Sequence, residues 1–165
     1  LPNVKLIALL RNPIKRAYSH HAMELKRGTE QLPFAEALAA EPERLAGEWE
    51  KVASNVSYRS FNIVFRAYLE RGKYLEQIRR WLQFYDRSQL LVLKSEDLFQ
   101  SPRATYERVC HFLGLEPYAQ TEFEQINPGA ERSAIDPELE SQLIDYFHPH
   151  NQALYEFLDE DFGWS

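Results

Sequence analysis

The sequence is poor in the residues that build disulfide frameworks and zinc sites. One cysteine, Cys110, occurs in 165 residues, which excludes an internal disulfide. It lies in a segment with the spacing of an amphipathic helix, where we expect a buried small side chain. Neither Cys-x-x-Cys nor His-Glu-x-x-His occurs. Because His20 and His21 would diverge by about 100° on a helix, they cannot ligate one ion together, and we expect no metal site.

Long apolar runs are also missing. No stretch of the sequence approaches the ~18 apolar residues that a membrane-spanning helix requires. The hydrophobic content of 44% and aromatic content of 13% nevertheless suffice for a packed core and exclude a wholly disordered chain. At this length, one domain covering residues 1–165 is the expected organisation.

The chain is acidic overall, with a formal net charge of −6, but its first 28 residues are basic. They carry six Lys or Arg side chains and one glutamate, whereas the remaining 137 residues carry 13 basic and 24 acidic side chains. A basic segment on an acidic protein attracts a small anion locally. It argues against a nucleic-acid partner, whose binding needs basic side chains spread along one face.

Two short apolar segments, at residues 4–10 and 89–94, predict buried strands. The other periodic segments predict helices, at residues 13–27, 33–45, 61–70, 73–85, 95–98, 102–112, 137–147 and 149–158. Residues 46–60 indicate a mixture of loop and helix, and residues 116–136 a loop. Ser95 and Ser101 are predicted helix caps. Two buried strands that are each followed by a helix are typical of a parallel α/β sheet, so the expected fold class is α/β, helix-rich with about two strands.

A strand-to-helix corner at residues 6–19 has the strongest functional pattern. An apolar run ends at Arg11, Pro13 suits the first helical position, and Ser19 follows inside the helix. Free N–H groups in the first turn and the helix dipole favour an anion there. Arg11 would lie at the carboxyl end of a strand, where open α/β sheets bind ligands, and the Ser19 hydroxyl can donate to a phosphate oxygen. The alternative is a common βα corner with an exposed arginine.

The sequence Arg-Asn-Pro-x-x-Arg-Ala-Tyr-Ser at residues 11–19 resembles the 3′-phosphate-binding motif of sulfotransferases that use 3′-phosphoadenosine-5′-phosphosulfate (PAPS). Further blocks are similar to the bacterial and heparan-type sulfotransferase domain, at residues 69–74, 81–85, 89–98, 101–102, 109–114, 146–155 and 161–164. The resemblance implies a P-loop-NTPase-like parallel sheet flanked by helices. It also implies that Arg11 and Ser19 bind the 3′-phosphate of the nucleotide, without a metal.

Two more residues become nucleotide-site candidates through the same resemblance. Tyr74 lies at a helix start in the family's cleft region, where it would contact substrate or nucleotide. The alternative is a core tyrosine on an apolar helix stripe. Arg132 lies in a loop, where related enzymes close over the nucleotide with basic residues, although Glu131 stands beside it here.

The resemblance implies in-line transfer of a sulfuryl group from PAPS to a hydroxyl or amine, which leaves 3′-phosphoadenosine-5′-phosphate. The family's 5′-phosphosulfate loop and catalytic base precede the arginine–serine motif, and no such sequence occurs here. No catalytic residue is therefore assigned, and the base is expected upstream of Leu1.

We expect the chain to be an N-terminally incomplete part of an enzyme and to be inactive by itself. We expect that enzyme to be cytoplasmic rather than in the Golgi lumen. The acceptor stays open among sugars, lipids, polyketides and small metabolites.

The alternative function is a non-catalytic interaction or regulatory domain that kept part of this fold. A P-loop kinase relative is disfavoured, because the Arg–Ser spacing serves a 3′-phosphate that ATP lacks. The expected partners are a nucleotide and an acceptor, without nucleic acid or a membrane span. The apolar strands would leave a sheet edge that needs cover. Three alternatives could cover this edge: a second copy of the chain through self-association, a missing N-terminal portion, or the chain's own helices.

Overall fold

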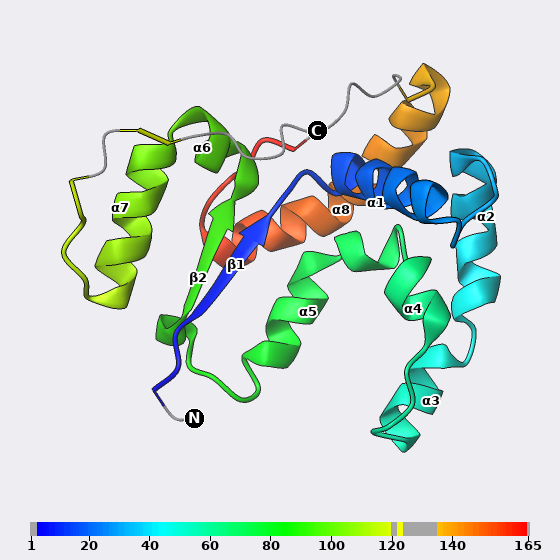
Figure 1. The fold of residues 1–165 in the computed structure, drawn as a ribbon, viewed down its shortest axis with the longest axis horizontal. Coiled ribbons are helices and arrows are strands. Elements are labelled where there is room, and N and C mark those ends of the chain that lie inside the picture. The colour runs from blue at the N-terminus through cyan, green and yellow to red at the C-terminus, as the bar shows by residue number, and fades with distance from the viewer. Residues whose placement is uncertain (1–2, 120–121, 124–134, 165) are drawn as a thin grey trace. The chain divides into compact units, whose positions relative to one another are not determined.

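The computed structural model describes residues 3–119, 122–123 and 135–164, which belong to two compact units (Figure 1). The first, named the strand unit, comprises Leu1–Arg11 and Glu76–Ala134. The second, named the helical unit, comprises Asn12–Leu75 and Ile135–Ser165. The chain therefore passes from one unit to the other directly after Arg11 and again after Leu75.

The strand unit contains a parallel pair of strands. Strand β1 (Leu6–Leu10) pairs with β2 (Leu90–Lys94) in a register that places Leu6 opposite Leu90 and Leu10 opposite Lys94. This confirms both predicted strands and their parallel arrangement. The short helix η2 (Arg87–Gln89) precedes β2.

Strand β1 is not buried on both faces, as its continuous apolar run predicted. Ile7 and Leu9 are 44% and 49% exposed, whereas three side chains of β2 are buried, namely Leu90, Val92 and Leu93. Alternate side chains of a strand share a face, so Ile7 and Leu9 project from the same side of β1. An apolar run indicates which residues favour burial, but it does not indicate which face of the strand another element covers.

Two helices follow β2 within the strand unit, α6 (Ser95–Gln100) and α7 (Pro102–Leu113). Pro102 occupies the first turn of α7, and Gly114 ends the helix in the left-handed conformation, with φ of 74°. Both boundaries follow the predicted positions. The predicted cap at Ser95 is wrong, because Lys94 is the N-cap and Ser95 is already helical. At Ser101, the N-cap of α7, no side-chain capping bond forms.

The helical unit consists of α1 (Pro13–Arg27), α2 (Phe34–Leu45), α3 (Glu48–Ser54), α4 (Phe61–Phe65), η1 (Glu70–Gly72) and α8 (Pro137–Leu158). Helix α5 (Tyr74–Trp81) begins in this unit and continues in the strand unit. The single helix predicted over residues 61–70 is wrong, since α4 stops at Phe65. Ala67 and Tyr68, which follow the end of α4, are both fully buried in the tertiary structure.

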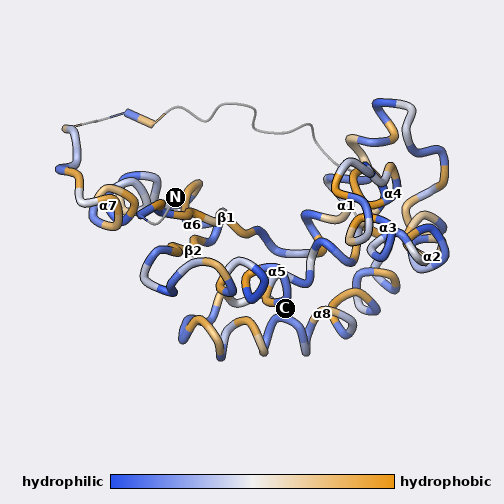
Figure 2. The backbone as a smooth tube through the Cα atoms, turned by 90° about the horizontal axis from the view of Figure 1, so that it is seen from below, coloured by the Kyte–Doolittle hydropathy of each residue, from blue (hydrophilic) through white to orange (hydrophobic). Residues whose placement is uncertain are grey.

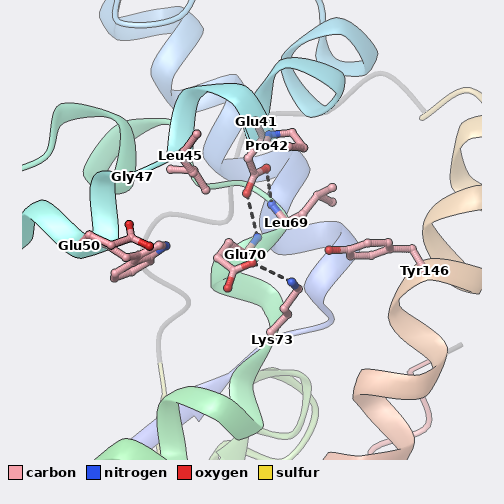
Figure 3. A pocket seen from close by; sticks show the side chains of 11 residues that line it. Glu41, Pro42, Leu45, Gly47, Glu50, Leu69, Glu70, Lys73 and Tyr146 are labelled. Atoms are coloured by element: carbon pink, nitrogen blue, oxygen red, sulfur yellow. Dashed lines mark hydrogen bonds and ion pairs between the residues drawn. The ribbon is translucent and has the colours of Figure 1, made fainter. Parts of the chain in front are cut away.

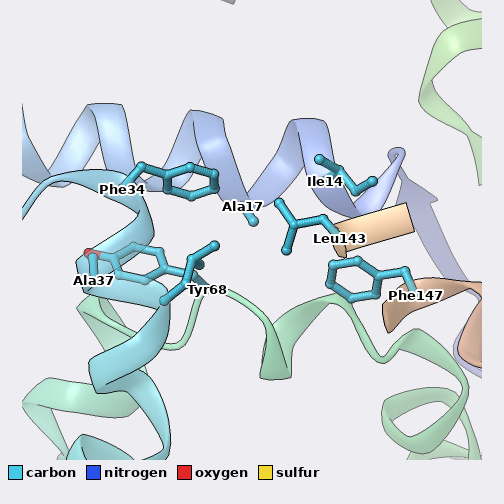
Figure 4. Close-up of a cluster of buried hydrophobic side chains, with 8 residues drawn as sticks. Ile14, Ala17, Phe34, Ala37, Tyr68, Leu143 and Phe147 are labelled. Atoms are coloured by element: carbon cyan, nitrogen blue, oxygen red, sulfur yellow. The ribbon is translucent and has the colours of Figure 1, made fainter. Parts of the chain in front are cut away.

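One cluster of apolar side chains forms the core of the helical unit (Figure 4). Ile14 and Ala17 of α1 face Leu143 and Phe147 of α8, and the buried Tyr68 ring lies among them. The remaining buried members come from α2, namely Phe34, Ala37 and Leu38. This packing fixes the face of α1 that points inward, and therefore the face that remains for other contacts.

Helix α8 is continuous, although Pro149 predicted a break between two helices. A proline inside a helix removes one hydrogen bond and crowds the preceding turn. Buried residues continue along one face on both sides of the proline, namely Leu143, Phe147, Asn151, Leu154 and Tyr155. Their spacing is that of a single helix, and the alternating colours of α8 in Figure 2 show the same amphipathic pattern. Tertiary burial of this face outweighs the local cost of Pro149.

The C-terminal tail is packed in the helical unit, as its aromatic residues predicted. Phe162 and Trp164 are 1% and 5% exposed. The Trp164 backbone N–H donates to the Tyr155 hydroxyl at 2.8 Å, and Asn151 donates to the Trp164 carbonyl at 3.2 Å. In the part of the chain that the structure describes, no helix is long and apolar enough to cross a membrane.

Candidate functional site

The first turn of α1 is capped by a side chain. Asn12 Oδ1 accepts hydrogen bonds from the backbone N–H groups of Ile14 at 3.0 Å and Lys15 at 3.1 Å. Pro13 has no N–H group, and the Arg16 N–H donates to the Asn12 carbonyl at 2.9 Å. The expectation that these amides are free for an anion is therefore wrong. Asn directly before a helix-starting proline is the local signal that could have predicted this cap.

Ser19 lies on the outward side of α1. It is half-buried, whereas Ala17 and His21, two residues to either side of it, are buried. The residues one turn away, Lys15 and Met23, are exposed. No described residue hydrogen-bonds to the Ser19 hydroxyl. The hydroxyl is thus available to a ligand that approaches this face of the helix.

Arg11 directly follows β1 and is the last residue of the strand unit's first segment. It is half-buried. Ser19 belongs to the helical unit, and residues 12–18 join the two. The position of Arg11 after the strand and of Ser19 within the helix agrees with the predicted local structure. Their joint binding of one phosphate stays a prediction.

Some of the basic side chains near this corner are used by the fold itself. Lys5 lies over an aromatic ring of the strand unit, with Nζ 4.6 Å from the ring centroid. Arg27 pairs with the buried Glu24 at 3.1 Å, and the Arg16 guanidinium donates to a backbone carbonyl. Burial lowers the pKa of Arg16. The positive charge available to a ligand is therefore smaller than the count of basic residues suggests.

The paired histidines after Ser19 are structural. His20 and His21 are 8% and 3% exposed, and His21 Nε2 lies 2.9 Å from the Leu32 carbonyl. Burial and the charges of Arg16 and Arg71 lower the pKa of His20 to about 4. Both rings pack against Tyr68 in the helical unit. No group of three metal-ligating side chains occurs within residues 3–119, 122–123 and 135–164.

Tyr74 is the first residue of α5 and is 8% exposed. Its ring centroid lies 5.9 Å from that of Trp164, and its side chain hydrogen-bonds with Arg16. This placement fits the core-tyrosine alternative, while contact with a nucleotide stays a prediction. Arg132, the other candidate, lies outside the described residues.

Comparison with known protein families identifies the fold. The sulfotransferase domain family matches residues 1–134 of the chain. The chain belongs to the sulfotransferase domain family. The Arg11–Ser19 segment and the two parallel strands lie inside the matched range, so the expected family and α/β fold are both confirmed.

This sulfotransferase domain is similar to human carbohydrate sulfotransferase 15, at 27% identity over 180 residues that cover 99% of the chain and 31% of that relative. It is 25% identical over 186 residues to human heparan sulfate glucosamine 3-O-sulfotransferase 6, covering 99% of the chain and 50% of the relative. The crystal structure of a sulfotransferase from Alicyclobacillus acidocaldarius matches with a TM-score of 0.71 at 26% identity, covering 98% of the chain and 57% of that protein. The chain thus spans between about a third and somewhat over half of these relatives' lengths.

Four glutamates that sequence reasoning did not single out are buried in the helical unit of the sulfotransferase domain: Glu24, Glu30, Glu41 and Glu48. Glu30 accepts hydrogen bonds from Arg44 at 2.6 Å and from the Tyr68 hydroxyl at 3.0 Å. Burial raises its pKa, but these bonds and two backbone N–H groups outweigh burial and bring the pKa to about 2. Its partners come from 14 and 38 residues away, so no local sequence signal reveals them.

Proposed function

We propose that this domain supplies the 3′-phosphate-binding part of a sulfotransferase that uses PAPS and transfers its sulfuryl group to a hydroxyl or amine. The observation that carries the proposal is the corner from β1 to α1, which lies within the matched family range. There Arg11 follows the strand, and the Ser19 hydroxyl, on the outward side of the helix, has no hydrogen-bond partner among the described residues.

Side chains, rather than helix amides, would hold the phosphate at this corner. Asn12 already satisfies the first-turn N–H groups, so the usual contribution of a helix N-terminus is reduced. A guanidinium matches two phosphate oxygens at once, and a serine hydroxyl adds one directed hydrogen bond. Arg11 and Ser19 would thereby distinguish nucleotides with a 3′-phosphate from those without one.

The role of these residues in transfer would be orientation. PAPS supplies the sulfuryl group, and its 3′-phosphate is remote from the reacting sulfur. Binding energy at a non-reacting group of a substrate can position the reacting bond. We assign no catalytic acid or base to residues of this chain.

Isothermal titration calorimetry with adenosine 3′,5′-bisphosphate and with adenosine 5′-monophosphate tests the proposal. The bisphosphate should bind at least about tenfold more tightly, the effect of a charge-assisted hydrogen bond. Arg11→Gln should weaken bisphosphate binding about 10- to 150-fold. Equal affinity for the two nucleotides would overturn the assignment.

Arg103→Gln is the matched control for charge. Arg103 pairs with Glu107 at 3.0 Å on the exposed side of α7, and both side chains are about half-exposed or more. This variant removes the same charge and should leave nucleotide affinity unchanged. If both arginine variants weaken binding equally, general electrostatic attraction explains the result and Arg11 has no specific role.

A non-catalytic interaction or regulatory domain is the alternative to the enzyme. Incubation of the 165-residue chain with labelled PAPS and a panel of hydroxyl and amine acceptors tests whether this chain alone performs transfer. We expect nucleotide binding without transfer for this chain alone. Transfer by the purified chain would show that its own residues perform the chemistry.

A further inference from the structure

A pocket with a volume of about 400 Å³ opens within the helical unit, apart from the Arg11–Ser19 motif (Figure 3). It is lined by residues of α2, α3, η1 and α8, with Lys73 directly after η1. None of these lining residues is among the proposed nucleotide contacts. The volume suits a small organic group, since ligand pockets of small molecules begin at a few hundred Å³.

The lining of the pocket includes a carboxyl group that is held in place by hydrogen bonds. Glu41 of α2 is 3% exposed and accepts hydrogen bonds from the backbone N–H groups of Leu69 at 2.7 Å and Glu70 at 2.9 Å. Figure 3 shows these two bonds joining α2 to the start of η1. Burial nevertheless raises the pKa of Glu41. Glu41 thus joins α2 to the start of η1 and holds the shape of the pocket.

Two aromatic side chains and an ion pair complete the lining. Trp49 of α3 and Tyr146 of α8 are 37% and 38% exposed, so each offers part of its ring to a ligand. Lys73 Nζ lies 2.7 Å from Glu70 Oε2, and the Tyr146 side chain points toward this pair in Figure 3. Burial opposes the charge on Lys73, but its bonds to Glu70 and Tyr146 raise its pKa.

The charge of the lining is negative. Among the eleven lining residues, all of which the structure describes, three are glutamates and one is a lysine. The lysine is already paired with Glu70, and burial disfavours the charged form of Glu41, so Glu50 is the lining carboxylate that is left for a ligand. A cation is attracted both by carboxylates and by the face of an indole ring, whereas a polyanion is repelled.

We propose that this pocket binds a positively charged group, such as an ammonium, on the acceptor of the sulfotransferase. The assignment to the acceptor rests on the proposed function, whereas the cation site rests on the pocket alone. The reacting hydroxyl or amine of such an acceptor lies outside the pocket. The domain would then select cationic or amine-bearing acceptors over polyanionic ones.

A titration of the 165-residue chain with choline, followed by NMR, tests the site. The chain has three tryptophans, so the Trp49 indole N–H signal is assigned with Trp49→Phe. Choline should shift the Trp49 signal. Its uncharged isostere 3,3-dimethylbutan-1-ol should bind at least about fivefold more weakly, because it lacks the charge. An unmoved Trp49 signal, or equal affinity for the two compounds, would overturn the proposal.

Three variants locate the interaction. Glu50→Gln should weaken choline binding about threefold, while Lys73→Met should strengthen it about threefold by removing the competing cation. Glu36→Gln is the matched control, because Glu36 is an exposed residue in the first turn of α2 and does not line the pocket. Weakening by Lys73→Met, or equal effects of the two glutamine variants, would contradict the site.

Nucleotide calorimetry distinguishes a failure of this inference from a failure of the proposed function. If choline binds in the pocket while adenosine 3′,5′-bisphosphate does not bind the chain, the cation site stands and its assignment to an acceptor falls. If the nucleotide binds and choline does not, the sulfotransferase proposal stands and the pocket has another role.

Discussion

The two units of the domain differ in which charged side chains they bury and which apolar side chains they expose. The helical unit buries four glutamates, and each has a hydrogen-bond or ion-pair partner. In the described part of the strand unit, the buried polar side chains are Ser95 and Thr105, while Ile7 and Leu9 of β1 are exposed. The helical unit thus provides partners for its buried carboxyl groups, whereas the strand unit keeps apolar surface on β1 that another element can cover.

The two units therefore depend on different interactions for folding and for association. A buried carboxylate is stabilising only while its partners remain in place, because an unpaired buried charge is costly. An exposed apolar strand face costs little folding free energy but favours association. Changes in the helical unit should therefore alter stability, and changes on β1 should alter self-association.

The largest effect is expected from Phe147 in the core of the helical unit. Phe147 is fully buried, so Phe147→Ala should lower the free energy of unfolding by about 3–5 kcal/mol. Urea denaturation followed by circular dichroism measures the change. Phe84→Ala in the strand unit is the control, because Phe84 is 80% exposed and its loss should change stability by less than about 0.5 kcal/mol. Similar losses for both variants would remove the contrast between the units.

Acid should destabilise the protein through Glu30. Its folded pKa of about 2 lies below the ordinary value of 4.5, so the unfolded chain binds more protons between these values and stability rises with pH. The contribution is present above about pH 5 and is lost as the pH falls toward 2, with a magnitude of about 3 kcal/mol. Urea midpoints measured between pH 7 and 3 for the wild type and Glu30→Gln give the difference. The variant should lose stability at pH 7 and show a smaller decline with acid, whereas parallel curves would contradict the assignment.

Gly72 should tolerate no side chain, because it packs directly against the core. A Cβ atom at this position would lie 2.6 and 2.8 Å from two Phe147 ring atoms and 3.1 Å from Pro13 Cβ. Gly72→Ala should therefore cost about 1–3 kcal/mol of unfolding free energy, the range of overpacked cores. In the double variant with Phe147→Leu the smaller side chain should relieve the clash, so the two losses should sum to more than the measured total. Simple additivity would show that Gly72 serves another purpose.

A small effect on stability, with a larger one on association, is expected on β1. Replacing Ile7 and Leu9 by threonine keeps strand propensity and should change the unfolding free energy by less than about 1 kcal/mol. It should lower concentration-dependent association, which light scattering measures over a range of concentrations. A wild-type chain that stays monomeric at all concentrations would show that this face needs no second copy.

Local patterns predicted the element boundaries that depend on nearby residues. The start of α1 at Pro13 and its end before Gly28 were predicted from cap chemistry, and the structure has both. The break after Phe65 and the continuity of α8 through Pro149 could not be predicted, because burial in the tertiary core decides them. Propensity is a weak signal when packing opposes it.

The candidate sites also comprise one part that the sequence predicted and one part that it did not. The spacing from Arg11 to Ser19 is a short-range pattern, so the sequence predicted the strand, the helix and the place of the serine within that helix. The pocket beside Glu41 could not be predicted, since its hydrogen bonds to Leu69 and Glu70 join residues 28 and 29 positions apart. Its lining comes from three separate segments of the chain, and sequence spacing does not reveal which of them meet.

A double-mutant cycle on nucleotide binding tests the central claim most directly, namely that Arg11 and Ser19 together recognise one 3′-phosphate. Calorimetry with adenosine 3′,5′-bisphosphate would compare Arg11→Gln, Ser19→Ala and the double variant, with Ser141→Ala on the exposed side of α8 as the control for Ser19. The account predicts that each single variant weakens binding, and that the double variant loses less than the sum by about 0.5 kcal/mol or more. It also predicts that binding of adenosine 5′-monophosphate is unchanged throughout. Additive losses, or equal losses for both nucleotides, would contradict it.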